Sequence, residues 1–125
     1  MSATEEKPRV LVVDDEQIIA NTLTQILNQS GFSATAAYSG EKAIEVASGL
    51  RPDILISDVV MLGMTGVDVA MAVSRNVPKC RVVLFSGQAA TADLLRRAED
   101  AGYHFEILAK PVHPRALLNL LQKKN

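Results

Sequence analysis

Acidic, hydroxyl and amine side chains follow four short apolar runs of this 125-residue chain. If these runs are parallel strands of one sheet, the side chains after them meet at its carboxyl edge, where open α/β sheets place their functional groups. The sequence therefore predicts one composite site. After the runs 9–13, 53–57, 81–85 and 105–109, the polar residues are, in turn, Asp14 to Glu16, Asp58, Ser86 and Lys110.

The three carboxylates of Asp14, Asp15 and Asp58 would repel one another and raise each other's pKa unless a cation offsets their charge. Oxygen ligands favour a hard ion such as Mg²⁺, and the cluster contains no Cys or His that would favour zinc. A carboxylate beside Mg²⁺, a hydroxyl and an ammonium group suits phosphoryl transfer. In that reaction a carboxylate oxygen attacks phosphorus and gives an acyl phosphate.

The elements that must position these residues alternate along the chain. Residues 9–13, 53–57 and 81–85 are continuous apolar runs, which is typical of parallel strands covered on both faces. Residues 33–38 and 105–109 are weaker strand candidates, placed where the alternation requires a strand. Five strands are therefore expected.

Apolar stripes with helical spacing lie between or after these strands. Ser39 is a candidate N-cap, and Pro114 suits a first helical turn. Right-handed crossovers then predict a flavodoxin-like (βα)5 doubly wound sandwich with the parallel strand order 2-1-3-4-5. The stripes are Ile19, Leu23, Ile26 and Leu27; Ala43, Ile44 and Ala47; Val67, Ala70, Met71 and Ser74; Leu94, Leu95, Ala98 and Ala101; and Ala116, Leu117, Leu120 and Leu121.

Composition limits the class of protein. The length and the 48% apolar content fit one domain over residues 9–125, preceded by a polar, flexible segment at 1–8. The net charge of −1 argues against direct nucleic-acid binding through a basic field. No apolar run approaches the roughly 18 residues of a membrane span. A single cysteine, Cys80, suits a reducing compartment, so a cytoplasmic location is expected.

In this order, the motifs VLVVDDE, DILISDVVMLGMTG, LFSG and ILAKP resemble the receiver domain of two-component response regulators, of the chemotaxis-regulator type. The resemblance covers about Arg9 to Leu121. It implies that Asp58 is the phosphoacceptor and that Ser86 and Lys110 bind phosphate oxygens. It also implies Mg²⁺ ligands from Asp14, Asp15, Asp58 and the carbonyl of Val60, and a cis peptide bond between Lys110 and Pro111.

The resemblance implies the partners as well. A histidine kinase or histidine phosphotransfer protein would donate the phosphoryl group, and the domain would catalyse its own Mg²⁺-dependent phosphorylation and slow dephosphorylation. Phosphorylation would switch a surface that binds a downstream protein or an output domain absent from this sequence. The chain would be either a stand-alone regulator or part of a longer protein.

Some positions depart from the family's pattern. Leu62 replaces a frequent proline, so the acceptor loop should be less rigid. Ile107 replaces the usual aromatic switch residue. Three explanations remain open: Ile107 itself responds through its packing, Phe105 or Tyr103 substitutes, or the output is muted. Val60 and Gln88 flank the site, and an apolar Val60 predicts a slowly decaying phosphoryl group.

Each feature taken singly has an ordinary structural explanation. An Asp pair often caps a helix, and a lone lysine is usually solvated. The combination favours a phosphoacceptor, with a constitutive receiver-like interaction scaffold as the alternative. A flavin or dinucleotide binder is disfavoured because the loop DDEQI is acidic and has no glycine. A dehalogenase-like phosphatase is disfavoured because Asp14 and Asp15 are adjacent instead of separated by one residue.

Overall fold

The computed structural model describes residues 6–87 and 91–123. Its centre is a parallel five-stranded sheet in the order β2-β1-β3-β4-β5, which confirms the predicted flavodoxin-like topology. The chain crosses from β1 to its outer neighbour β2 and then returns past β1 to β3. The strands are β1 (Arg9–Val13), β2 (Ser33–Ala37), β3 (Ile54–Asp58), β4 (Arg81–Ser86) and β5 (Glu106–Ala109).

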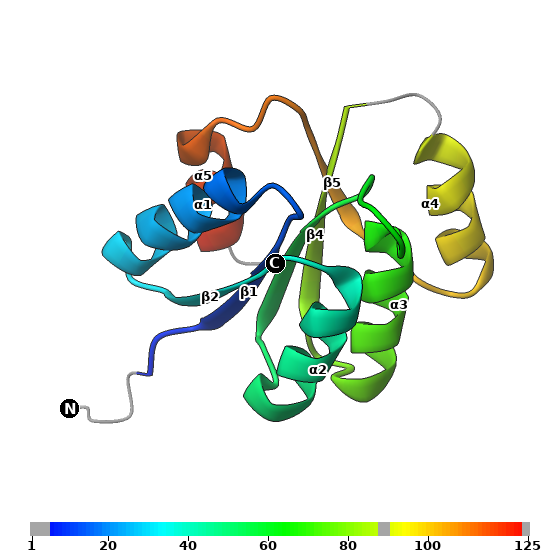
Figure 1. Cartoon of the computed structure of the whole chain (residues 1–125), viewed down its shortest axis with the longest axis horizontal. Helices are drawn as coiled ribbons and strands as arrows, with labels where there is room; N and C mark the ends of the chain where they lie inside the picture. Colours follow the sequence, from blue (N-terminus) through cyan, green and yellow to red (C-terminus); the bar gives the residue numbers. More distant parts are fainter. Residues whose placement is uncertain (1–5, 88–90, 124–125) are drawn as a thin grey trace.

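Helices cover both faces of this sheet. Figure 1 shows α1 and α5 on one side, and α2, α3 and α4 on the other. None of the helices in the described part of the chain has the length and apolar character of a membrane span. The helices are α1 (Gln17–Gln29), α2 (Gly40–Leu50), α3 (Gly66–Asn76), α4 (Thr91–Asp100) and α5 (Pro114–Gln122).

The central strands are apolar on both sides because each side faces a separate core. Leu11 and Leu55 belong to the cluster beneath α2, α3 and α4, whereas Val12 and Ile56 belong to the cluster beneath α1 and α5. Their side chains are 0% or 1% exposed. Burial of this kind contributes roughly 1.5–3 kcal/mol per large aliphatic side chain. The two cores therefore hold β1 and β3 rigidly and fix where these strands end.

Local signals define several helix ends. The hydroxyl of Ser39 accepts a hydrogen bond from the Lys42 backbone N–H, as expected of an N-cap. Pro114 occupies the first turn of α5. Thr65 and Asp68 form a capping box at the start of α3, with each side chain bonded to the other residue's backbone N–H. This box fixes the end of the loop that leaves β3.

Two predicted helix positions were wrong. Ala101 is exposed because α4 ends at Asp100, where Tyr103 N–H returns to the Ala98 carbonyl. Ala116 is exposed, and α5 buries Leu117 and Leu121 instead. Strand ends also moved: Asp58 and Ser86 are the last residues of β3 and β4 and do not lie beyond them. Residues 1–5 and Gln88 lie outside the described residues.

Candidate functional site

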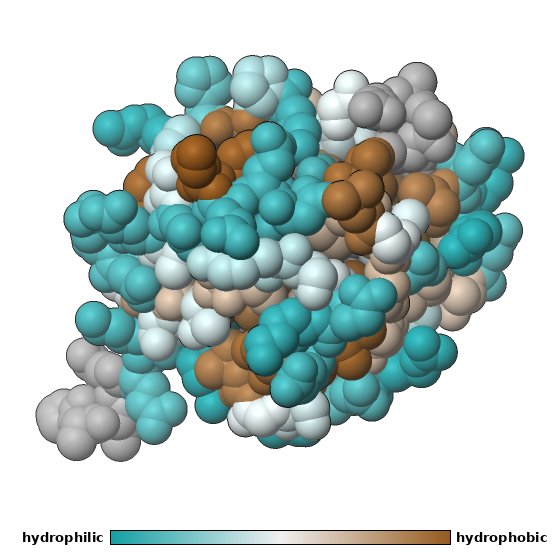
Figure 2. All heavy atoms as spheres, viewed as in Figure 1, coloured by the Kyte–Doolittle hydropathy of each residue, from teal (hydrophilic) through white to brown (hydrophobic). Residues whose placement is uncertain are grey.

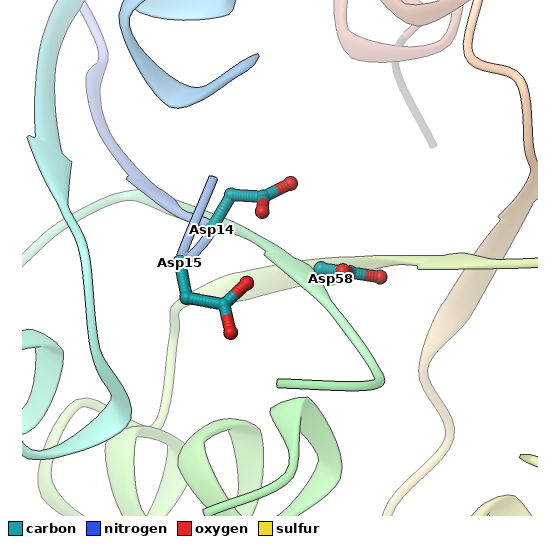
Figure 3. Close-up of side chains that lie close together, drawn as sticks. All are labelled: Asp14, Asp15 and Asp58. Carbon is teal, nitrogen blue, oxygen red and sulfur yellow. The ribbon is translucent and has the colours of Figure 1, made fainter. Parts of the chain in front are cut away.

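Three carboxylates meet at the carboxyl edge of the sheet. Asp14 and Asp15 follow β1, and Asp58 ends its neighbour β3. One carboxylate oxygen from each residue lies within 4.8 Å of the others. Figure 3 shows the three side chains gathered around one small region. The structure thus brings together the three acidic residues that the sequence placed in one site.

Asp14 is the most buried member of the group, with 1% of its surface exposed. Its Oδ1 accepts a hydrogen bond of 2.9 Å from the Glu16 N–H, but its buried Oδ2 has no hydrogen-bond partner. Burial is the main reason why the pKa of Asp14 is raised, and the nearby Asp58 and Asp15 charges add to this effect. An orphaned buried oxygen in an all-carboxylate cluster fits a hard divalent cation as the missing partner.

Asp15 is held by the loop between β3 and α3. Its Oδ2 accepts a hydrogen bond of 2.9 Å from the backbone N–H of Leu62, near the tip of that loop. The Leu62 side chain contributes nothing to this contact and is 85% exposed. The backbone of the loop between β3 and α3 therefore positions one of the candidate metal ligands.

Asp58 forms an ion pair with Lys110. The Lys110 ammonium nitrogen lies 3.0 Å from Asp58 Oδ1, and only 8% of the Asp58 side chain is exposed. To make this contact Lys110 reaches from the end of β5 across β4. Gly87 provides the room, since a Cβ there would lie 3.2 Å from the Cβ of Lys110. The peptide bond from Lys110 to Pro111 is cis, as predicted.

The loop between β3 and α3 closes tightly behind Asp58. The N–H of Val59 bonds to the Phe85 carbonyl, and the N–H of Gly66 bonds to the Val59 carbonyl. A Cβ on Gly66 would lie 2.0 Å from the Asp58 carbonyl oxygen, so only glycine allows this approach. Gly66 thereby lets α3 begin directly against the backbone of Asp58.

The other predicted site residues lie around this centre. Ser86 ends β4 opposite Ala109 of β5, and is therefore at the same edge of the sheet. Val60 lies in the loop between β3 and α3, with 50% of its surface exposed. The backbone carbonyl of Val60 is the predicted fourth ligand of Mg²⁺. Gln88, predicted to flank the site, is outside the described residues.

Of the residues discussed as switch elements, Ile107 lies within β5, whereas Tyr103 and Phe105 precede this strand. Ile107 on β5 is 42% exposed. The rings of Tyr103 and Phe105 stack with centroids 5.7 Å apart, and both side chains pack against the core beneath α4. The two aromatic residues thus form a unit at the opposite end of β5 from Lys110.

Two contributors to the site were not found from sequence. The Leu62 amide was missed because a backbone donor leaves no trace in residue type. Gly66 was missed although its place shortly after the acceptor run, just inside a helix start, is a usable signal for close backbone approach.

Several known proteins are similar to this chain. The DNA-binding response regulator MtrA of Mycolicibacterium paratuberculosis is 30% identical over 114 residues, which cover 90% of this chain and 48% of MtrA. A cyclic di-GMP phosphodiesterase of Thermotoga maritima is 31% identical over 115 residues, covering 92% of this chain and 29% of that protein. The chain thus spans half or less of the length of these relatives.

Solved structures agree with this similarity. The chemotaxis response regulator CheY4 of Vibrio cholerae superposes with a TM-score of 0.81 at 28% identity, covering 94% of this chain and 98% of CheY4. A receiver domain from Methanospirillum hungatei gives a TM-score of 0.85 at 22% identity, covering 94% and 92%, and supports the fold alone. The family model of the response regulator receiver domain matches residues 10–122. The chain belongs to the response regulator receiver domain family.

Proposed function

We propose that this domain accepts a phosphoryl group on Asp58 from a phosphohistidine and uses the change to alter a protein-binding surface. The observation that carries the proposal is the meeting of three carboxylates and the Lys110 ammonium group at one edge of the sheet. Asp58 is the acceptor because it is the carboxylate paired with Lys110, whereas Asp14 and Asp15 are held by backbone amides.

In the proposed reaction an oxygen of Asp58 attacks phosphorus. A new P–O bond forms, the P–N bond to the donor imidazole breaks, and the imidazole leaves with the bonding electron pair. Lys110, already 3.0 Å from Asp58, would pair with a phosphoryl oxygen, and Ser86 would donate its hydroxyl hydrogen to another.

Asp14, Asp15, Asp58 and the carbonyl of Val60 would hold Mg²⁺, which when bound supplies charge neutralisation for the transferring phosphoryl group. The orphaned Asp14 Oδ2 supports this assignment. Without a cation the acidic cluster would repel the negatively charged phosphoryl group. Phosphorylation is therefore expected to require a divalent ion.

A protein donor is supported by the apolar surface beside the site. A groove of about 590 Å³ runs from Ile18 and Ile19 at the start of α1 to Lys110, Pro111 and Val112 after β5. Ile18 is 82% exposed. Figure 2 shows apolar patches over α1 and α5 and over the loop before α3, separated by polar side chains. A histidine kinase or histidine phosphotransfer protein could bury this groove while presenting its phosphohistidine.

The alternative is a receiver-like scaffold that binds partners constitutively. It is supported by Ile107, which is 42% exposed and lacks the aromatic ring of the usual switch residue. Both functions allow Mg²⁺ binding, so metal binding alone does not separate them. They differ in whether phosphorylation changes the surface formed by α4, β5 and α5.

The test is incubation with acetyl phosphate and Mg²⁺, followed by intact-mass and amide NMR measurements. One added phosphate is expected in the wild type and none in Asp58→Asn, with shifts in the resonances of α4 and β5. Asp53→Asn is the matched control, because Asp53 is exposed just before β3, at the end of the strand opposite to Asp58. No mass gain in the wild type would refute acceptance of the phosphoryl group. A mass gain without shifts would favour the scaffold.

A further inference from the structure

The structure contains a backbone contact that joins a candidate metal ligand to the acceptor loop. Leu62 N–H donates a 2.9 Å hydrogen bond to Oδ2 of Asp15. Asp15 follows β1, and Leu62 lies in the loop after β3, so the bond ties two separate segments of the site together. A proline at position 62 could not make this bond because it has no N–H.

The bond leaves the second oxygen of Asp15 available. A carboxylate has two oxygens with about four acceptor positions, so one amide does not exhaust it. One oxygen of Asp15 also lies within 4.8 Å of oxygens from Asp14 and Asp58. The amide therefore holds the carboxylate in the cluster while the group keeps capacity for a cation.

The loop tip is exposed. The Leu62 side chain is 85% exposed, and the next residue, Gly63, has a positive φ of 79° that turns the chain. Met61 is the buried anchor of this segment, at 8% exposed. The orientation of Asp15 and the conformation of residues 62 and 63 should therefore depend on each other.

We propose that the Leu62 amide is a positioning group for Mg²⁺, which orients Asp15 for the ion and couples ion binding to the conformation of the acceptor loop. The inference rests on the metal site of the proposed function. Hydrogen bonds that orient ligating carboxylates typically change metal affinity by about tenfold or more when they are lost. Coupling is reciprocal, so bound Mg²⁺ in turn stabilises the loop conformation that makes the bond.

The test compares Leu62→Pro with Leu62→Ala by calorimetric titration with Mg²⁺. The first variant removes the donor, whereas the second removes the exposed side chain and keeps the N–H. The dissociation constant should rise about tenfold in Leu62→Pro and change less than about twofold in Leu62→Ala. Equal affinities of the two variants, or tighter binding by Leu62→Pro, would overturn the proposal.

A second variant removes only the N–H. Replacing Leu62 by its α-hydroxy acid through suppression in cell-free synthesis gives an ester at this position with an unchanged side chain. This ester should weaken Mg²⁺ binding as Leu62→Pro does, and wild-type affinity in the ester would overturn the proposal even if Leu62→Pro misfolds.

The wild-type protein provides an independent readout by hydrogen exchange of the Leu62 amide. Exchange should slow when Mg²⁺ is added, and faster exchange would mean that the ion competes with the amide, contrary to the proposal. If the wild type binds no Mg²⁺, the metal site of the proposed function fails together with this inference. If the wild type binds Mg²⁺ and Leu62→Pro binds it as tightly as Leu62→Ala does, this inference fails but the proposed metal site stands.

Discussion

The ammonium nitrogen of Lys110 lies 3.0 Å from Oδ1 of Asp58, and the lysine reaches it across the end of an intervening strand. Lys110 also acts on Asp14, since its positive charge opposes the rise in the pKa of that buried carboxyl. One cation of the chain therefore offsets part of the charge of the acidic cluster before any metal binds.

Lys110→Met should destabilise the metal-free protein by about 2 kcal/mol, because the nearly buried Asp58 loses its counter-charge. This value is lower than the cost of breaking a fully buried ion pair, because 32% of the Lys110 side chain is exposed to solvent. Chemical denaturation in EDTA measures the change. Lys42→Met is the control, since the Lys42–Glu45 pair is exposed and should contribute roughly 0–0.5 kcal/mol.

Added Mg²⁺ should stabilise Lys110→Met more than it stabilises the wild type. Without the lysine the cluster is more negative and binds a cation more strongly, and ligand binding stabilises the folded state by mass action. If Mg²⁺ stabilises the two proteins equally, the charge of Lys110 does not affect cation binding by the acidic cluster.

The central strands could be predicted from sequence because burial on both faces leaves a continuous apolar run. Residues 9–13 and 81–85 illustrate this, and Arg9–Val13 agrees with its prediction in full. The composite site could be predicted from the residue types that follow the strands, since the carboxyl ends of neighbouring parallel strands lie at the same edge of the sheet. Helix surfaces were harder: Ala101 and Ala116 fit the helical spacing, but a small apolar residue carries little preference for burial.

Contacts that depend on backbone conformation or strand register were not predictable. The bond from the Leu62 amide to Asp15 exists only after the loop has folded around Gly63. Arg81 and Glu106 each look like ordinary surface residues in the sequence. Their pairing follows from the register of β4 against β5. Glu106 of β5 lies opposite Val83 of β4, and Arg81 is two residues before Val83 on the same strand.

Arg81 fastens β5 and the end of α5 to the start of β4. Its guanidinium group donates to both carboxylate oxygens of Glu106, and to the carbonyls of Leu120, Leu121 and Lys123. Arg81→Met should therefore lower the free energy of unfolding by about 2 kcal/mol, since hydrogen bonds to charged groups contribute roughly 1.5–3 kcal/mol. Urea denaturation gives the value.

Arg9→Met is the matched control for Arg81, because Arg9 also begins a strand and also pairs with a carboxylate. The Arg9 and Asp53 side chains are 48% and 53% exposed, so their pair should contribute less than about 1 kcal/mol. Equal losses in the two variants would show that neither the less exposed pair with Glu106 nor the bonds of Arg81 to α5 add stability.

Cys80 should be an unreactive thiol at mild pH. Burial raises its pKa to about 12 from 9.0, so at pH 8 the native thiolate fraction is very small. Labelling with iodoacetamide at pH 8 should be at least about a hundredfold slower in the native protein than in the denaturant-unfolded protein. Comparable labelling rates would contradict this.

The raised pKa of Cys80 also has a consequence for stability. The unfolded chain loses the thiol proton from about pH 9, whereas the native state keeps it until about pH 12. The contribution of this group to stability is therefore complete below pH 9 and declines as the pH rises through that interval. The free energy of unfolding of Cys80→Ala, measured by denaturation at rising pH, should lack the decline that the thiol causes. An identical pH dependence in the wild type and the variant would refute the assignment.

Gly66 allows α3 to start against the backbone of Asp58. In Gly66→Ala the new Cβ would lie 2.0 Å from the Asp58 carbonyl oxygen, which is backbone and cannot rotate away. The loop and Asp58 must shift, so we expect the free energy of unfolding to fall by about 3 kcal/mol or more, together with weaker Mg²⁺ binding. Gly49→Ala in α2 is the control, because a Cβ there meets nothing within 4 Å. That control should be neutral or more stable by up to about 1 kcal/mol. If Gly66→Ala keeps wild-type stability and Mg²⁺ affinity, the backbone of Asp58 tolerates displacement. The tight closure behind Asp58 is then not required to hold its carboxylate in the cluster.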